Sequence, residues 1–429
     1  MVLSLLAGGA TESEASKLTN VIDAFNRKTG KKIDVTASVG WHFWQRQGRI
    51  RREFRCVSHD TAVAPFCPED SKIIDVDELQ LKRLVHLMNV DLEIGFWRYA
   101  QLHINIPVIL TDRTQVTFAP GVDRFNSTVD TENRPSLFSV PFEGVDRHGL
   151  GDPTFGLRFN PYSSARDSAR PTWSIGLDFK VPVAKIKMAD NDHVGEGIFS
   201  ITLSTAISTR VAPWVEPYFR LGGTFNLPGK NSLFEEFGKT QTLVEPGHQL
   251  AITFGTEFIP YENPATEQYF ILDVGTRVRF QFEGRAYTDL FGPLGSSPCD
   301  PSDPTNPCSL TTFSRGDIDP LTGQPRKTNG LTDIEQYATV SAWFGFRWQM
   351  QRHIQLRALF SFSHETNHFL TTADAGKDLD SRNQVEKRNS QGENEYNPVY
   401  NSAFDSLGTR FLTGGVFRYG LQVSLLGKF

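Results

Sequence analysis

The chain has 429 residues, and its 33 phenylalanines against 4 methionines give an apolar inventory that favours β-structure. No stretch approaches about 18 consecutive apolar residues, which excludes helical membrane spans. The formal net charge of -5 gives no argument for a nucleic-acid partner.

Residues 1–30 are predicted to form a lead-in that is separate from the rest of the chain. The first ten residues, which end in LAGGA, resemble the end of a secretory signal with a small-residue cleavage site, although no basic segment precedes them. Thr11 and Glu14 form a capping box, and apolar residues follow at helical spacing: Leu18, Val21, Ile22 and Phe25. The predicted short amphipathic helix ends near Gly30. It is either a lead-in that lies in the periplasm or inside the barrel lumen, or a helix that docks a partner.

After Lys32 the apolar residues recur with a period of two, which is the period of a β-strand with two different faces. Twelve segments show this alternation, an even number as expected for single-chain antiparallel barrels. The predicted strands lie near residues 33–43, 84–96, 102–110, 154–160, 172–183, 198–209, 214–226, 248–260, 269–283, 335–348, 353–364 and 411–428.

The connections between these strands alternate in length. Short turns are predicted near 97–100, 161–171, 210–213, 261–268 and 349–353. The other connections are mostly long and polar, near 45–81, 111–153, 227–247, 284–333 and 365–410, with a shorter one at 184–197. This alternation predicts a barrel with all short turns and both termini at one end and all long loops at the other.

The final segment, from Phe411 to Phe429, is apolar on one face, polar on the other and ends in an aromatic residue. It resembles the assembly signal of bacterial outer-membrane β-barrels. The resemblance implies that residues 31–429 form an all-β, twelve-stranded antiparallel transmembrane barrel in the outer membrane of a Gram-negative cell, with both termini periplasmic. It implies outer-membrane lipid, lipopolysaccharide and the barrel-assembly machinery as partners. We predict no cofactor and no nucleic acid.

Aromatic residues gather near the predicted strand ends, as in the interfacial girdle of a membrane barrel. The predicted girdle comprises Trp41, Phe43, Trp97, Tyr99, Trp173, Trp214, Tyr261, Trp343 and Trp348.

The segment from Gly149 to Phe159, GLGDPTFGLRF, resembles the G-x-G-D stretch of the MetA-pathway phenol-degradation group of outer-membrane transporter-like proteins. In that group the stretch opens a strand just inside the outer rim. The resemblance implies uptake of small solutes, aromatic ones included. As a nucleotide fingerprint the glycine cluster fails, because it precedes a strand and no helix follows.

The face opposite the apolar one is densely charged. Arg277, Arg279, Arg347 and Arg357 lie on three successive predicted strands, which predicts a contiguous basic stripe that attracts anionic solutes. The alternative is that acids and bases pair across strands as a rigid polar core. The predicted pore-lining set is Arg158, Lys180, Arg220, Arg277, Arg279, Arg347, Arg357, Arg418, Asp178, Glu216, Glu257 and Asp273.

Five arginines crowd the first long connection: Arg46, Arg49, Arg51, Arg52 and Arg55. They are predicted either to form a solvated hairpin extension or to bind phosphates of lipopolysaccharide, or another anionic ligand, by bidentate contacts.

The four cysteines form two local pairs in predicted loops, Cys56 with Cys67 and Cys299 with Cys308. Such pairs suit disulfides in an oxidising space. Zinc is the alternative, but neither pair has the C-x-x-C spacing.

Residues His364 to His368 match the H-E-x-x-H pattern, which on a helix binds zinc. Here the pattern follows a strand, and a third ligand would have to be Glu393 or Glu395. The same stretch resembles the H-x-S-N patch of outer-membrane lipid hydrolases, with Thr366 in place of the nucleophilic serine. We therefore predict no catalytic residue and no metal. The loop around Asp374, Asp378 and Asp380 could be considered for calcium, but it lacks the residue pattern of an EF-hand.

Two functions remain in the lead. The first is a channel or transporter for small solutes, anionic or aromatic. The second is a non-conducting barrel that serves as a subunit or anchor of a larger envelope complex for motility, adhesion or secretion. An outer-membrane lipid hydrolase is a distant third.

Overall fold

The computed structural model describes residues 33–56, 72–97, 100–130, 136–164, 170–230, 243–263, 265–296, 313–318, 325–382, 385, 389–393, 395–397 and 399–429. The predicted helix within residues 1–30 lies outside these ranges. So do Cys67, Cys299 and Cys308, which leaves both disulfides as predictions.

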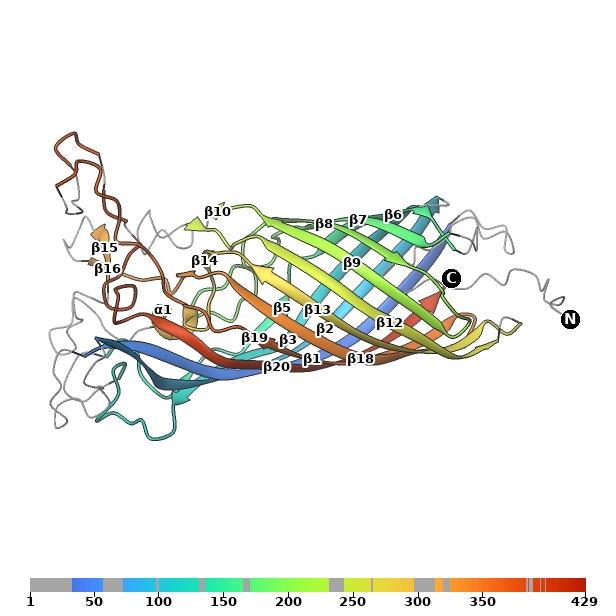
Figure 1. Cartoon of the computed structure of the whole chain (residues 1–429), viewed down its shortest axis with the longest axis horizontal. Coiled ribbons are helices and arrows are strands. Elements are labelled where there is room, and N and C mark those ends of the chain that lie inside the picture. Colours follow the sequence, from blue (N-terminus) through green and yellow to red (C-terminus); the bar gives the residue numbers. More distant parts are fainter. Residues whose placement is uncertain are drawn as a thin grey trace, which may run out of the picture.

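Twelve strands form one closed antiparallel barrel (Figure 1). Each strand pairs with its neighbours in the chain, and β1 pairs with β20 to close the sheet. The wall consists of β1 (Asp34–Arg55), β2 (Ile73–Trp97), β3 (Ala100–Phe118), β6 (Thr154–Tyr162), β7 (Thr172–Lys180), β8 (Ser200–Ser208), β9 (Val215–Asn226), β12 (Gln249–Asn263), β13 (Gln268–Gln281), β18 (Tyr337–Gln351), β19 (Ile354–Glu365) and β20 (Phe411–Lys428). The predicted all-β class, strand number and antiparallel order are confirmed.

The long connections contain short elements that the alternation does not predict. They are β4 (Phe142–Glu143), β5 (Arg147–Leu150), β10 (Gly229–Lys230), β11 (Leu243–Val244), β14 (Gly284–Ala286), α1 (Phe291–Gly295), β15 (Phe313–Ile318), β16 (Pro325–Lys327) and β17 (Thr332–Ile334). Of these, β4 and β5 pair with β3, and the other strands form three two-stranded sheets, β10 with β11, β14 with β17 and β15 with β16. Among the described residues, no helix is long and apolar enough to cross a bilayer.

The two ends of the barrel differ, as Figure 1 shows. Short connections join β2 to β3, β6 to β7, β8 to β9, β12 to β13 and β18 to β19 at one end, which we call the turn end. β1 begins and β20 ends there. The long connections gather at the opposite end, which we call the loop end. The predicted alternation of short and long connections is confirmed.

The outer face of the wall is apolar around the barrel. Val39, Phe254 and Phe344 are 50%, 51% and 59% exposed, and residues on every strand share this orientation. Residues directly opposite one another on paired strands point to the same side of a sheet, so the pairing fixes which side chains point inward. By this test all twelve residues of the predicted pore-lining set point into the barrel.

β1, β2 and β3 extend far beyond the predicted strand ends. β1 runs to Arg55, so the loop predicted over residues 45–81 is wrong for most of its length. In this extension the pattern inverts: Gln47 and Arg49 point outward, whereas Leu79 and Leu81 point inward and are buried. The inversion follows from the surroundings, because the outer face is polar here and the inner face packs against an apolar core.

That core lies at the loop end of the barrel, where residues of the long connections pack against the inner face of the wall. Ile50, Leu79 and Val116 of the wall, each 0% exposed, pack against loop residues that include Phe138 and Leu290. We call the cluster the loop-end plug, and it comprises Ile50, Leu79, Leu81, Val116, Val129, Leu137, Phe138, Val140, Leu290, Leu294, Ile334, Leu370, Ala403, Phe404 and Phe411.

Candidate functional site

A row of arginines and hydroxyl residues crosses the inner wall. Arg277 of β13 lies opposite Ser341 of β18, which lies opposite Ser363 of β19. Ser363 lies opposite Arg418 of β20, and Arg418 lies opposite Arg46 of β1. Extended across the neighbouring strands at each end, this row is the arginine band: Arg220, Thr253, Arg277, Ser341, Ser363, Arg418, Arg46 and Arg83.

The band runs obliquely along the barrel. Strands tilt in a barrel, so a row of opposed residues climbs along the axis from strand to strand. At one end Arg46 contacts Asp289, in the loop before α1. At the other end Arg220 is within electrostatic range of Arg158, which lies opposite the second residue of β3 and thus near the turn end. The band therefore leads from the turn end toward the loop end.

The next inward row toward the turn end contains aromatic residues. Trp343 lies opposite Gly275, and Tyr218 lies opposite Gly255. Both rings lie so close to these glycines that a Cβ atom at either position would overlap them. Trp44 of β1 occupies the same row, three strands beyond Trp343. Glycine in the wall thus gives the rings room beneath the arginines.

These rings, rather than carboxylates, contact the central arginines. The guanidinium of Arg418 lies 4.1 Å from the ring centroid of Trp44, and that of Arg277 lies 5.7 Å from the centroid of Trp343. The Arg277 Nε atom also donates to Thr253 Oγ1 at 3.1 Å. Within the described part of the chain, no carboxylate forms an ion pair with any of four inward arginines, namely Arg220, Arg277, Arg279 and Arg418.

Nearer the turn end the inward charges are paired. Arg347 forms an ion pair with Glu257, and the two side chains are 4% and 2% exposed. Arg357 Nε donates to Gln355 Oε1 at 2.5 Å. Two further predicted pore-lining residues near the turn end have ionic partners, Arg158 with Glu93 at 3.9 Å and Glu216 with Arg210 at 4.0 Å. Lys180, at the loop end of β7, pairs with Glu196 at 3.4 Å.

The register divides the predicted basic stripe. Arg277 lies opposite Ser341, whereas Arg347 lies opposite Ile271. Arg277 and Arg347 are therefore six residues apart along the strands, about 20 Å. Arg347 and Arg357 lie opposite each other near the turn end. The prediction of one contiguous stripe is wrong, because neighbouring strands do not by themselves give neighbouring residues.

The two predicted acidic residues near the band do not pair with its arginines. Asp273 accepts hydrogen bonds from the Tyr218 hydroxyl at 2.7 Å and from Trp343 Nε1 at 3.2 Å. Asp178 lies over Gly156 on the neighbouring strand. Asp273 therefore positions the aromatic row.

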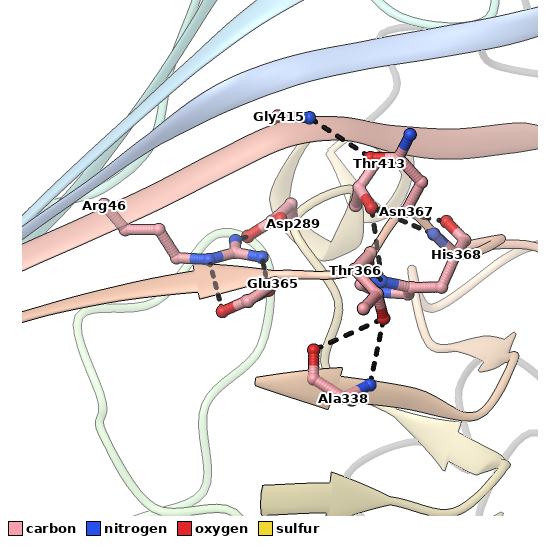
Figure 2. Close-up of polar contacts among 9 residues, drawn as sticks. All are labelled: Arg46, Asp289, Ala338, Glu365, Thr366, Asn367, His368, Thr413 and Gly415. Atoms are coloured by element: carbon pink, nitrogen blue, oxygen red, sulfur yellow. Dashed lines mark hydrogen bonds and ion pairs between the residues drawn. The ribbon is translucent and has the colours of Figure 1, made fainter. Parts of the chain in front are cut away.

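Arg46 binds two acids at the loop end of the band, as Figure 2 shows. It contacts Asp289 through Nη1, and it donates to Glu365 from Nε at 3.3 Å and from Nη2 at 2.7 Å. Its side chain is 13% exposed. Arg46 thus ties the loop before α1 to the wall at β19.

The other arginines predicted in the first loop lie on β1. Arg52 is buried in the loop-end plug, where it donates to the Ala403 carbonyl oxygen at 2.7 Å. Arg49 forms an ion pair with Asp77 at 2.9 Å, Arg51 with Asp77 at 3.2 Å, and Arg55 is exposed at the end of β1. The five arginines therefore do not share one outward surface, since Arg46 and Arg52 point inward. The contact with phosphates of lipopolysaccharide stays a prediction.

The H-E-x-x-H side chains do not converge. His364 is exposed on the outer face with its ring 5.2 Å from that of Phe417. His368 is buried and stacks on Tyr337 at 4.0 Å. Glu365 points inward to Arg46. Three neighbouring residues on different sides of the wall cannot bind one zinc ion.

The Thr366 hydroxyl forms hydrogen bonds with the backbone of Ala338 and not with a histidine ring. Figure 2 shows its hydroxyl accepting from Ala338 N at 3.0 Å, while Asn367 Oδ1 accepts from Gly415 N at 3.2 Å. Elsewhere in the described residues, Asp378, Asp380 and Glu395 bring carboxylate oxygens within 4.8 Å of one another. No further observation there points to an ion.

Ionisable groups in the loops respond to burial and to nearby charges. Burial lowers the pKa of His368, and Glu365 opposes this effect. Burial raises the pKa of Asp405 to about 8. Lys187 holds the pKa of Glu196 well below its usual range.

Several residues of the site are missing from the predicted set. Trp44, Ser341 and Ser363 were not singled out, and Trp343 was predicted to belong to the lipid-facing girdle. The signal that finds them is parity, because Trp343 shares its strand face with Ser341 and Arg347.

No family model and no curated protein sequence matches the chain. Among solved structures, it is similar to an outer-membrane channel from Pseudomonas putida F1, with 10% identity, 92% of this chain and 95% of that chain covered, and a TM-score of 0.42. It is also similar to a Pseudomonas aeruginosa FadL homologue, with 11% identity, 93% of this chain and 90% of that chain covered, and a TM-score of 0.32. For the translocator domain of the autotransporter NalP from Neisseria meningitidis the identity is 8%, 94% of this chain and 90% of that chain are covered, and the TM-score is 0.33. These identities and TM-scores are too low to transfer a function.

Proposed function

We propose that the chain is an outer-membrane barrel that conducts small anionic solutes past the arginine band. The outer wall supports the membrane location, since a closed sheet whose exposed face is apolar on every strand buries that face in lipid. The loop end is then extracellular, both termini are periplasmic, and lipid and lipopolysaccharide surround the wall.

The observation that carries the proposal is the set of inward arginines with no carboxylate partner in the described residues. Arg277 is exposed on the inner face, and Arg220 and Arg418 are half-buried there. Fixed positive charge on a pore wall attracts anions and repels cations. Paired charges, such as Arg347 with Glu257, contribute little to such a field because they cancel.

Planar-bilayer recording tests the proposal. Under a KCl gradient, the reversal potential of the wild type is expected to have the same sign as the equilibrium potential of chloride. Replacing Arg277, Arg279 and Arg418 together by Gln is expected to reduce this preference. Arg352→Gln is the matched control, because Arg352 is 52% exposed and pairs with Glu267 at the turn end. Unchanged selectivity in the triple variant would reject these inward arginines as the selectivity element.

The loop-end plug favours a second function, a non-conducting barrel within a larger envelope assembly. Loop residues such as Phe138 and Leu290 pack against Ile50 on the inner face of the wall, which places folded loops inside the loop end of the barrel. The same recordings separate the two functions. A correctly folded barrel that stays silent supports the non-conducting subunit.

A further inference from the structure

Arg279 lies between two other inward arginines of the wall, Arg277 and Arg418. Arg279 lies on β13, one inward position nearer the loop end than Arg277, and it is within electrostatic range of both Arg277 and Arg418. Glu365 is also within range of Arg279, but both of its oxygens already bind Arg46. The repulsion of Arg279 with Arg277 and with Arg418 is therefore left for water or a bound anion to offset.

Two serines lie between these arginines. Ser341 and Ser363 lie between Arg277 and Arg418 in the arginine band. Arg277 and Arg418 are three strand spacings apart, about 14 Å between their Cα atoms. Neither hydroxyl forms a hydrogen bond with any described residue. A serine side chain covers little of the wall, and its hydroxyl can donate to an oxyanion.

Aromatic rings position the arginines without neutralising them. Arg418 lies over Trp44, and Arg277 lies near Trp343. Asp273, the acid on the same strand as Arg277, accepts from Trp343 instead. A guanidinium stacked on a ring keeps its charge and its in-plane N–H donors, which suit bidentate bonds to an oxyanion.

We infer that this cluster is a binding site for a small dianion, such as phosphate or a short dicarboxylate. We call it the dianion site, and it comprises Arg277, Arg279, Arg418, Ser341 and Ser363. A dianion offsets more of the repulsion than a monoanion and has enough oxygens for several guanidinium groups. The inference rests on the proposed anion channel and adds that the channel holds dianions in preference to monoanions.

Isothermal titration of the folded barrel in detergent micelles tests the inference at constant ionic strength. The probes are inorganic phosphate and succinate as dianions, at about pH 8 where phosphate is mostly doubly charged, and acetate as the monoanion. We expect each dianion to bind about tenfold tighter than acetate, because a second charge adds charge-assisted hydrogen bonds. A preference between phosphate and succinate identifies which dianion chemistry the site takes.

Two variants assign the binding to the site. Arg279→Gln combined with Arg418→Gln is expected to weaken phosphate binding about tenfold or more, whereas the control Arg352→Gln binds as the wild type does. Circular dichroism and tryptophan fluorescence confirm that each variant is folded. Equal affinity for phosphate and acetate, or full phosphate affinity in the double variant, would overturn the inference.

The two proposals fail in different ways. Anion-selective current without a preference for dianions removes the dianion site and leaves the channel. Tight binding of dianions by a barrel that carries no current supports the site and removes the channel.

Discussion

Two arginines on the same inner wall are held in different ways. Arg347, near the turn end, is buried and paired with Glu257. Arg418, midway along the barrel, lies over Trp44 and has no carboxylate partner in the described part of the chain. Charge that is buried must be paired to be stable, whereas charge that remains half-exposed need not be. The comparison separates charges that hold the wall together from charges that are available to a solute.

The largest expected effect is on the paired charge. Glu257→Gln leaves Arg347 buried without its counter-charge, which is expected to cost about 3–5 kcal/mol in the free energy of unfolding. Arg418→Gln is expected to cost less than about 1 kcal/mol, since no ion pair is lost. Urea unfolding in lipid vesicles, followed by tryptophan fluorescence, measures both. Equal losses would remove the distinction between the two arginines.

A second change separates the loop-end plug from the wall. Leu290 is 0% exposed in the plug, and Leu290→Ala leaves a cavity that is expected to cost about 2–5 kcal/mol locally. Hydrogen exchange is expected to rise in the loop residues while amides of β13 stay protected. Uniform loss of protection along the chain would show that the plug and wall unfold as one unit.

A smaller, pH-dependent effect is expected at His368, in the loop after β19. Its pKa is lowered by burial, so the unfolded chain binds the proton more readily than the folded one. The stabilisation from His368 is therefore complete above its ordinary pKa, about 6.5, and is lost as the pH falls below it. Glu365, Arg46 and Asp289 also face this histidine.

Comparison with His368→Gln at each pH isolates this contribution, because Asp405 and the other groups titrate in both proteins. The stability advantage of the wild type is expected to shrink below about pH 6.5. An advantage that stays constant from pH 8 to about pH 5 would contradict the assignment.

The smallest effect is expected at His364. His364→Ala removes an exposed ring that touches Phe417, so the free energy of unfolding is expected to change by about 0.5 kcal/mol or less. Equilibrium dialysis with zinc is expected to give the same binding for variant and wild type. Zinc that is lost with His364 would restore the metal-site hypothesis.

The alternation of side chains predicted the wall of the barrel but not its extension at the loop end. Alternation works where the outer face is apolar and the inner face polar, as at Phe254 and Thr253. It fails where Leu79 and Leu81 point inward, because there the inner face packs against loops whose folding no local pattern encodes. For this reason the alternation predicts a loop over residues 45–81, where β1 and β2 continue.

The candidate site was predictable in its residue types but not in its arrangement. Parity placed Arg277 and Arg347 on the inner face. Whether they are neighbours depends on register, which is fixed by pairing along the whole strand. Register replaces the predicted stripe with the arginine band. It places Arg277 of β13 and Arg418 of β20 in one row, although these two strands are not adjacent.

The reversal potential of Arg418→Glu, compared with that of the wild type under the same KCl gradient, tests the central claim most directly. If the half-exposed arginines set the selectivity, the wild type prefers chloride. The charge reversal at Arg418, in the middle of the band, then moves the reversal potential toward the equilibrium potential of potassium. A wild type that prefers potassium, or a potential that the substitution leaves unchanged, would contradict the account.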